Sequence, residues 1–268
     1  MSDVATTELG EGPAVLLVHG LNGFKEGWGP LPAALADAGH RVIALDLPGF
    51  GESPRLRRTT PEALADAVRP FVERHAPVGL VAHSLGTQVA MILAAGDPAR
   101  VRRVALLSPR VLARPRSLPP RRVSDVLQLP LVGRPLARVV IARMRRDPER
   151  RRQAYLSVLA HPDRLADDPG TRALLELASD RLVDADLRAM ADWAASGMAL
   201  DVRPLAPRMP QPTLAVAGSR DRVTPVEGAL QLVSVLPAGR MLRLPDIAHF
   251  PHLEAPGEVL PALADHLA

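Results

Sequence analysis

Cysteine is absent from this chain of 268 residues. Its absence excludes a disulfide framework, a thiolate nucleophile and a cysteine-ligated zinc site. No stretch reaches the about 18 uninterrupted apolar residues of a membrane-spanning helix, and the N-terminus lacks the basic start and apolar run of a secretory signal. We therefore expect a cytoplasmic protein without an integral membrane segment.

Aromatic side chains and lysine are also scarce. Aromatic residues make up 3% of the chain, Lys25 is the only lysine and Tyr155 is the only tyrosine. Because so little titrates between neutrality and the pKa of arginine, a formal net charge of only +4 accompanies a pI of 10.6. With so few rings to stack on bases, the high pI does not indicate a nucleic-acid partner.

What the chain does contain is enough apolar material for one sizeable domain, at 47% hydrophobic residues. Apolar segments typical of strands alternate with segments of helical spacing. The predicted strands are 14–18, 41–45, 78–83, 101–107, 213–217 and 241–244, and the predicted helices between them are 31–38, a helix opening at 60–62, 85–95, 226–236 and 256–267. This alternation predicts an α/β fold with a mostly parallel sheet covered by helices on both faces.

Strand signals vanish between residue 110 and about residue 203. Helical stretches are predicted there instead, at 138–146, 150–159, 171–177 and 186–196. We therefore predict a core domain formed by residues 1–109 and 204–268, with a helical insertion at 110–203.

Arginine is concentrated in the first half of that insertion. It occurs at positions 110, 114, 116, 121, 122, 134, 138, 143, 145, 146, 150, 151 and 152, against only Asp125, Asp147 and Glu149. One explanation is a solvated helical face. The other is a positive rim that steers an anionic substrate, a phosphorylated carrier or an acidic surface.

Ser84 lies where the strand at 78–83 meets the helix that follows. Ala82 and Gly86, two positions to either side, are small enough for strand and helix to approach closely. Such a corner pushes a serine hydroxyl clear of the backbone, and the N–H groups of the helix then point toward any oxyanion formed there. Ser84 is thus the candidate nucleophile, although the same pattern also occurs where serine only caps a helix.

A serine nucleophile needs a base and an acid. Asp221 follows the strand at 213–217 in a glycine-containing turn and is the candidate acid, with Glu227 and Asp246 in reserve. The position after the strand at 101–107, Ser108, offers no carboxylate.

Eight histidines compete for the role of base. They are His19, His40, His75, His83, His161, His249, His252 and His266. His249, just beyond the strand at 241–244, is preferred over His252. His40, His75 and His266 lie at the ends of predicted elements and are expected to be solvated.

Five motifs in order carry a resemblance to a known family. They are His19-Gly20, Asp46-Leu47-Pro48-Gly49-Phe50-Gly51-Glu52-Ser53, Ala82-His83-Ser84-Leu85-Gly86, Gly218-Ser219-Arg220-Asp221 and the stretch from His249 to Pro256. From about Ala14 to its end, the insertion excepted, the chain resembles α/β-hydrolase fold enzymes of the serine-nucleophile branch. That esterase- and lipase-like branch carries a helical cap after the sixth core strand and uses the chain order Ser, Asp, His. Ala82 departs from the G-x-S-x-G pattern by one methyl group.

The resemblance implies a Ser-His-Asp triad, with an oxyanion hole formed by the backbone N–H groups of Leu21 and Leu85. It implies no cofactor and no metal, and the spacing of Asp46, His19 and His83 follows no metal-binding pattern.

The function expected from these residues is hydrolysis of a small-molecule carboxylic ester, thioester or lactone through an acyl-enzyme. Two alternatives stay open, which are cleavage of carbon–carbon bonds in diketone-type substrates and a non-catalytic binding module. The sequence specifies neither the acyl and alcohol groups nor the oligomeric state.

Overall fold

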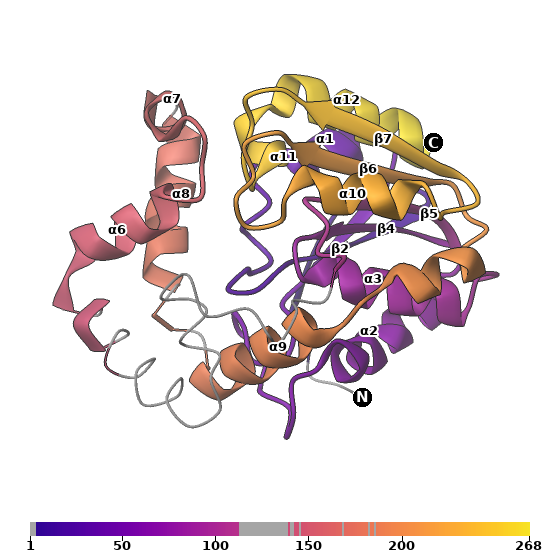
Figure 1. Ribbon diagram of the computed structural model, residues 1–268, viewed down its shortest axis with the longest axis horizontal. Coiled ribbons are helices and arrows are strands. Elements are labelled where there is room, and N and C mark those ends of the chain that lie inside the picture. Colours follow the sequence, from indigo (N-terminus) through magenta and orange to yellow (C-terminus); the bar gives the residue numbers. More distant parts are fainter. Residues whose placement is uncertain are drawn as a thin grey trace.

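The computed structural model describes residues 4–112, 139, 142–144, 146–167, 169–181, 183–184 and 186–268. Its centre is a seven-stranded sheet in the order β1-β3-β2-β4-β5-β6-β7 (Figure 1). The strands are β1 Thr6–Leu9, β2 Ala14–Val18, β3 Arg41–Leu45, β4 Val78–His83, β5 Val101–Leu107, β6 Thr213–Gly218 and β7 Gly239–Leu244. Every neighbouring pair is parallel except β1 and β3. The predicted mostly parallel sheet is confirmed.

Among the strands of the described residues, β1 is the one that the sequence did not indicate. Its residues, TTEL, are mostly exposed, and it pairs antiparallel with β3 at the edge of the sheet. An edge strand with little buried surface lacks the apolar pattern by which the inner strands were recognised.

Helices cover both faces of the sheet (Figure 1). On one face lie α1 Leu31–Asp37 and α12 Pro256–Leu267, and on the other lie α2 Pro61–His75, α3 Gly86–Gly96 and α10 Val226–Val233. Alternate residues of β2 serve the two cores, since Val15 and Leu17 pack toward α1 and α12, whereas Leu16 and Val18 pack toward α2 and α3. Burial on both faces explains why the inner strands are continuously apolar.

Between β5 and β6 the secondary-structure elements of the described residues are helices, as predicted. The helices are α6 Pro148–Leu156, α7 Pro162–Asp167, α8 Pro169–Arg181 and α9 Leu187–Ala199, followed by a 3-10 helix at Arg203–Arg208. We call residues 148–199 the helical segment. In Figure 1, α6, α7 and α8 gather to one side of the sheet, and α9 returns toward α2. Of the predicted helix at 138–146, residues 138, 140, 141 and 145 lie outside the described part, and the division into core and insertion stays a prediction.

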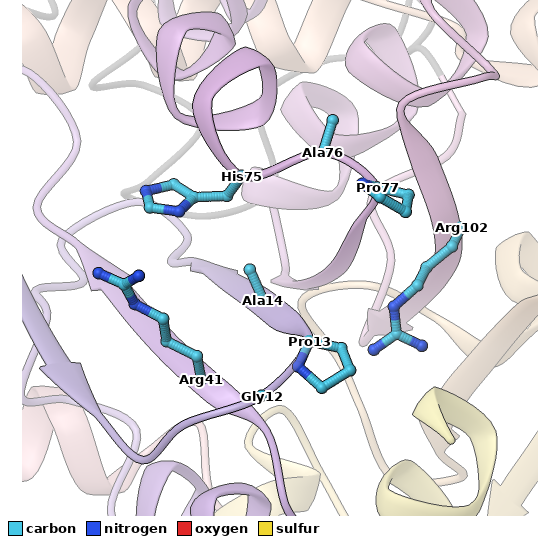
Figure 2. A pocket seen from close by; sticks show the side chains of 8 residues that line it. All are labelled: Gly12, Pro13, Ala14, Arg41, His75, Ala76, Pro77 and Arg102. Carbon is cyan, nitrogen blue, oxygen red and sulfur yellow. The ribbon is translucent and has the colours of Figure 1, made fainter.

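A hollow of about 460 Å³ lies at the amino ends of β2, β3 and β5 (Figure 2). Arg41, His75 and Arg102 line it, but Arg41 is already paired with Glu8 at 2.5 Å, and Arg102 donates to the carbonyl of Leu267. Because Ser84 follows the carboxyl end of β4, the hollow and the predicted site lie at opposite ends of the parallel strands.

Candidate active site

Ser84 occupies the corner between β4 and α3. Its φ is 53°, in the left-handed region that residues other than glycine seldom adopt. A Cβ at Gly86 would stand 2.3 Å from the carbonyl oxygen of His19, so only glycine fits there. Strand β2 and helix α3 therefore approach closely enough to force the turn that holds Ser84.

The structure brings together the three residues predicted to form the triad. His249 Nε2 lies 3.0 Å from Ser84 Oγ, and His249 Nδ1 lies 2.8 Å from Asp221 Oδ2. With Nδ1–H donating to the carboxylate, Nε2 carries the lone pair that can accept the serine proton. All three side chains are buried. The arrangement suits nucleophilic attack by Ser84 with His249 as general base.

Asp221 is held by more than the histidine. Its Oδ1 accepts from the backbone N–H groups of Val223 at 2.8 Å and Thr224 at 2.9 Å, and its Oδ2 accepts from the Thr224 hydroxyl at 2.7 Å. Burial by itself raises the pKa of Asp221, but the hydrogen bonds from His249 and Thr224 outweigh it and lower the pKa to about 2. Asp221 therefore stays an anion and can stabilise an imidazolium at His249.

Thr224→Val should lower the free energy of unfolding at pH 7 by roughly 1.5–3 kcal/mol, because it removes a donor to a buried charged group. A pKa lowered in the folded state stabilises the protein above the ordinary pKa of aspartate, and this contribution is lost as the pH falls toward 2. The difference in free energy of unfolding between Thr224→Val and wild type should therefore shrink as the pH falls from about 4 to about 2. Urea unfolding across this range measures it. Thr224→Ser, which keeps the hydroxyl, is the control, and equal stability of the valine and serine variants would contradict the assignment.

His83 supports the loop that carries His249. Its Nε2–H donates to the carbonyl of His249 at 2.7 Å, and the centres of the two rings are 4.8 Å apart. Burial, together with the neighbouring histidines His249 and His252, lowers the pKa of His83 well below the usual range. A neutral His83 can hold the base without repelling an imidazolium.

His252, the second candidate for the base, packs against Trp28 and His83. Its ring packs 5.3 Å from Trp28 and 5.4 Å from His83, measured between ring centres. Burial, aided by the charge of His249, lowers its pKa to about 3. His252 is thus a neutral packing residue behind the site.

The loop predicted to supply part of the oxyanion hole lies directly against Ser84, the candidate nucleophile. A Cβ at Gly20 would stand 2.8 Å from the Cβ of Ser84. His19 fixes this loop, since its Nε2 accepts from the backbone N–H of Leu47 at 2.9 Å and its Nδ1–H donates to the carbonyl of Gly20 at 2.7 Å. Burial lowers the pKa of His19 to about 4, against the bond to Gly20, so the ring stays neutral.

Leu21 follows Gly20 in this loop, and Leu85 follows Ser84 at the start of α3. Their backbone N–H groups stay the predicted donors of the oxyanion hole.

Asp46 has a structural role. It accepts from the backbone N–H of Lys25 at 2.6 Å and pairs with the Lys25 ammonium at 3.2 Å. Within the part of the chain that the structure describes, no group of three histidine, aspartate or glutamate side chains is placed to hold a metal ion.

A family model described as alpha/beta hydrolase fold matches residues 13–256. The chain belongs to the α/β-hydrolase fold family. It is 27% identical over 267 residues to a pimeloyl-[acyl-carrier protein] methyl ester esterase of Chromobacterium violaceum, covering 97% of this chain and 96% of that protein. It is 30% identical over 263 residues to the enzyme of the same name from Methylococcus capsulatus, covering 91% and 90%.

Among solved structures, a thermophilic esterase from Thermogutta terrifontis superposes with a TM-score of 0.76 at 24% identity, covering 98% of this chain and 92% of that chain. This likeness concerns the fold. In the described residues of this α/β hydrolase, no helix has the length and apolar character needed to cross a bilayer. The cytoplasmic location stays a prediction.

The reserve acids of this α/β hydrolase are exposed, unlike the buried Asp221. Glu227 is exposed, and Asp246 is exposed and paired with Arg220 at 2.9 Å. The expectation that His40 and His266 are solvated is wrong, because their exposures are 4% and 7%. His266 donates to the carbonyl of Val104 in β5 at 2.9 Å, so it lies on the side of α12 that faces the sheet. His75 is half-buried.

Two residues of the site escaped the sequence reasoning. Thr224 bonds to Asp221, and its position three residues after an aspartate in a turn is a signal that could have drawn attention to it. Glu254 was visible only as part of the His249-to-Pro256 motif, and nothing in the sequence marks the groups that it contacts.

Proposed function

We propose that this α/β hydrolase is a cofactor-independent serine esterase that cleaves a small-molecule carboxylic ester, thioester or lactone through an acyl-enzyme on Ser84. The observation that carries the proposal is the continuous hydrogen-bonded chain from Ser84 through His249 to Asp221. The names of the similar proteins, methyl ester esterases and an esterase, support the same class of reaction.

In the proposed reaction His249 Nε2 takes the hydroxyl proton as Ser84 Oγ attacks the carbonyl carbon. The resulting oxyanion faces the backbone N–H groups of Leu21 and Leu85. Collapse of the tetrahedral intermediate breaks the ester bond, and the alcohol leaves with the proton held by His249. Water then attacks the acyl-enzyme, giving its proton to His249, and the acid departs as Ser84 regains its hydroxyl proton.

A fluorophosphonate probe followed by mapping of the labelled peptide tests this proposal. Labelling should occur at Ser84 and should persist in EDTA, because no metal takes part. A panel of methyl esters of increasing acyl length then sizes the substrate. An unlabelled but folded protein would favour the binding module, and turnover of diketone-type substrates without ester turnover would favour the carbon–carbon hydrolase.

The arginine-rich half of the insertion supports a preference for anionic substrates within this class. Arg150 and Arg152 are 58% and 46% exposed, and their ion-pair partners three residues earlier, Asp147 and Glu149, lie at 3.7 and 3.8 Å. Arg151 differs, because it is only 11% exposed and is bonded to Asp180 at 2.8 Å. The arginines at 114, 116, 121, 122, 134, 138 and 145 lie outside the described residues.

Replacing Arg146, Arg150 and Arg152 together by glutamine should lower kcat/KM for an anionic ester several-fold at low salt and leave a neutral ester of equal size unaffected. Wild-type kcat/KM for the anionic ester should fall as ionic strength rises from about 10 mM to 0.1 M, over which the Debye length shrinks from about 30 to about 10 Å. Steady-state kinetics on the matched pair of esters measures both effects. An equal salt response for the two esters would leave a solvated face as the explanation.

A further inference from the structure

Glu254 connects the loop of His249 to the helical segment. It is the last residue of α11 Pro251–Glu254. Its Oε2 accepts from the backbone N–H of Ala160 at 2.7 Å and from that of Ala248 at 3.3 Å, and its Oε1 accepts from that of Phe250 at 3.1 Å. Ala248 and Phe250 flank His249, whereas Ala160 lies between α6 and α7. One carboxylate thus joins two parts of the chain that are 94 positions apart.

Further contacts join the same two parts. The backbone N–H of His249 donates to the carbonyl of Val158 at 3.3 Å. The ring of Phe250 lies 5.3 Å from that of Tyr155, measured between ring centres, and Phe250 also packs against the small core of the helical segment. That core consists of Leu159, Leu165 and Leu175. The backbone of His249 is therefore held from the helical segment, while its ring is held by Asp221 and Ser84.

The surroundings of Glu254 make the carboxylate hard to replace. Burial raises the pKa of Glu254, and the bonds from Ala160, Phe250 and Ala248 oppose that rise. Glu254 is half-buried, and a carboxylate partly removed from water is tolerated when several donors satisfy it. Three N–H groups converge on its two oxygens, so a side chain with one oxygen cannot accept all of them.

We propose that Glu254 is a positioning residue that fixes the backbone of His249 relative to the helical segment, so that the base and the helices beside it are set in place together. It acts through the backbone on both sides of His249 and touches no reacting atom. This inference rests on the proposed esterase function. Because a displacement of about 1 Å in a catalytic group can cost about 100-fold in rate, loosening this joint should lower kcat.

Glu254→Gln is the variant that tests the proposal, and Glu258→Gln is its matched control. Glu258 is an exposed glutamate in the first turn of α12. Glu254→Gln should lower kcat for a small neutral ester by about 10- to 100-fold with little change in KM, and Glu258→Gln should leave both unchanged. Hydrogen exchange should become faster at residues 158–160 and 248–250 of Glu254→Gln, with the strands of the sheet unaffected.

A second variant covers the case in which Glu254→Gln does not fold. Glu254→Asp keeps the charge but withdraws the oxygens by one carbon–carbon bond, which should break the bond to Ala160. It should raise exchange at 158–160 and lower kcat to a smaller extent. An unchanged kcat in a folded variant, or a loss that only matches the unfolded fraction, would overturn the positioning role.

The exchange measurement needs no substrate, so it separates this inference from the proposed function. If the fluorophosphonate does not label the wild-type protein, the proposed esterase function is refuted. Hydrogen exchange in Glu254→Gln would still test whether Glu254 links the His249 loop to the helical segment. If amide hydrogen exchange at residues 158–160 and 248–250 is no faster in Glu254→Gln than in Glu258→Gln, the inference is overturned, even when the wild-type enzyme is active.

Discussion

Ser84→Ala is expected to lower kcat for ester hydrolysis by about 10⁶-fold, the scale seen when a triad serine is removed from a hydrolase of this mechanism. The substitution removes the hydroxyl oxygen that lies 3.0 Å from His249 Nε2, so no acyl-enzyme can form. Alanine keeps the Cβ that packs against the Gly20 loop, and the strained φ of 53° is no harder for alanine to adopt than for serine. The fold should therefore survive.

Kinetics with an activated ester measures this loss, and circular dichroism confirms folding. Labelling by the fluorophosphonate should disappear in the same variant, which guards against a contaminating esterase. Turnover within tenfold of wild type in purified, folded Ser84→Ala would refute the nucleophile assignment.

His249→Ala should lower ester turnover by several orders of magnitude, because Ser84 then has no base and the leaving alcohol has no acid. Neither neighbouring histidine is placed to replace it, since His83 bonds to the backbone of the same loop and His252 packs against Trp28. Both of these histidines have pKa values lowered by burial.

His252→Ala is the contrasting variant and should have a mild effect on kcat per folded molecule. It empties a buried site beside Trp28, so the free energy of unfolding should fall by about 1–3 kcal/mol instead. Steady-state kinetics and urea unfolding on both variants separate the two roles. An active His249→Ala beside an inactive, folded His252→Ala would reverse the assignment.

The corner at Ser84 could be predicted because its cause is local. Small residues, an apolar strand and a helix-forming segment lie next to one another in the chain, and together they specify the turn whose φ the structure shows. The order of Ser84, Asp221 and His249 along the chain was equally visible. The hydrogen bonds of 3.0 and 2.8 Å that join them came only with the fold, since 165 positions separate Ser84 from His249.

By itself, then, the sequence determined the parallel sheet, the helices on its faces and the identity of the candidate triad, because periodic burial and turn-forming residues are encoded locally. Tertiary structure alone decided that β1 adds an antiparallel edge and that His40 and His266 are buried. It also decided that Glu254 reaches the helical segment. That contact ends on the backbone N–H of Ala160, a group that almost every residue carries, so no side chain in the sequence could have marked it.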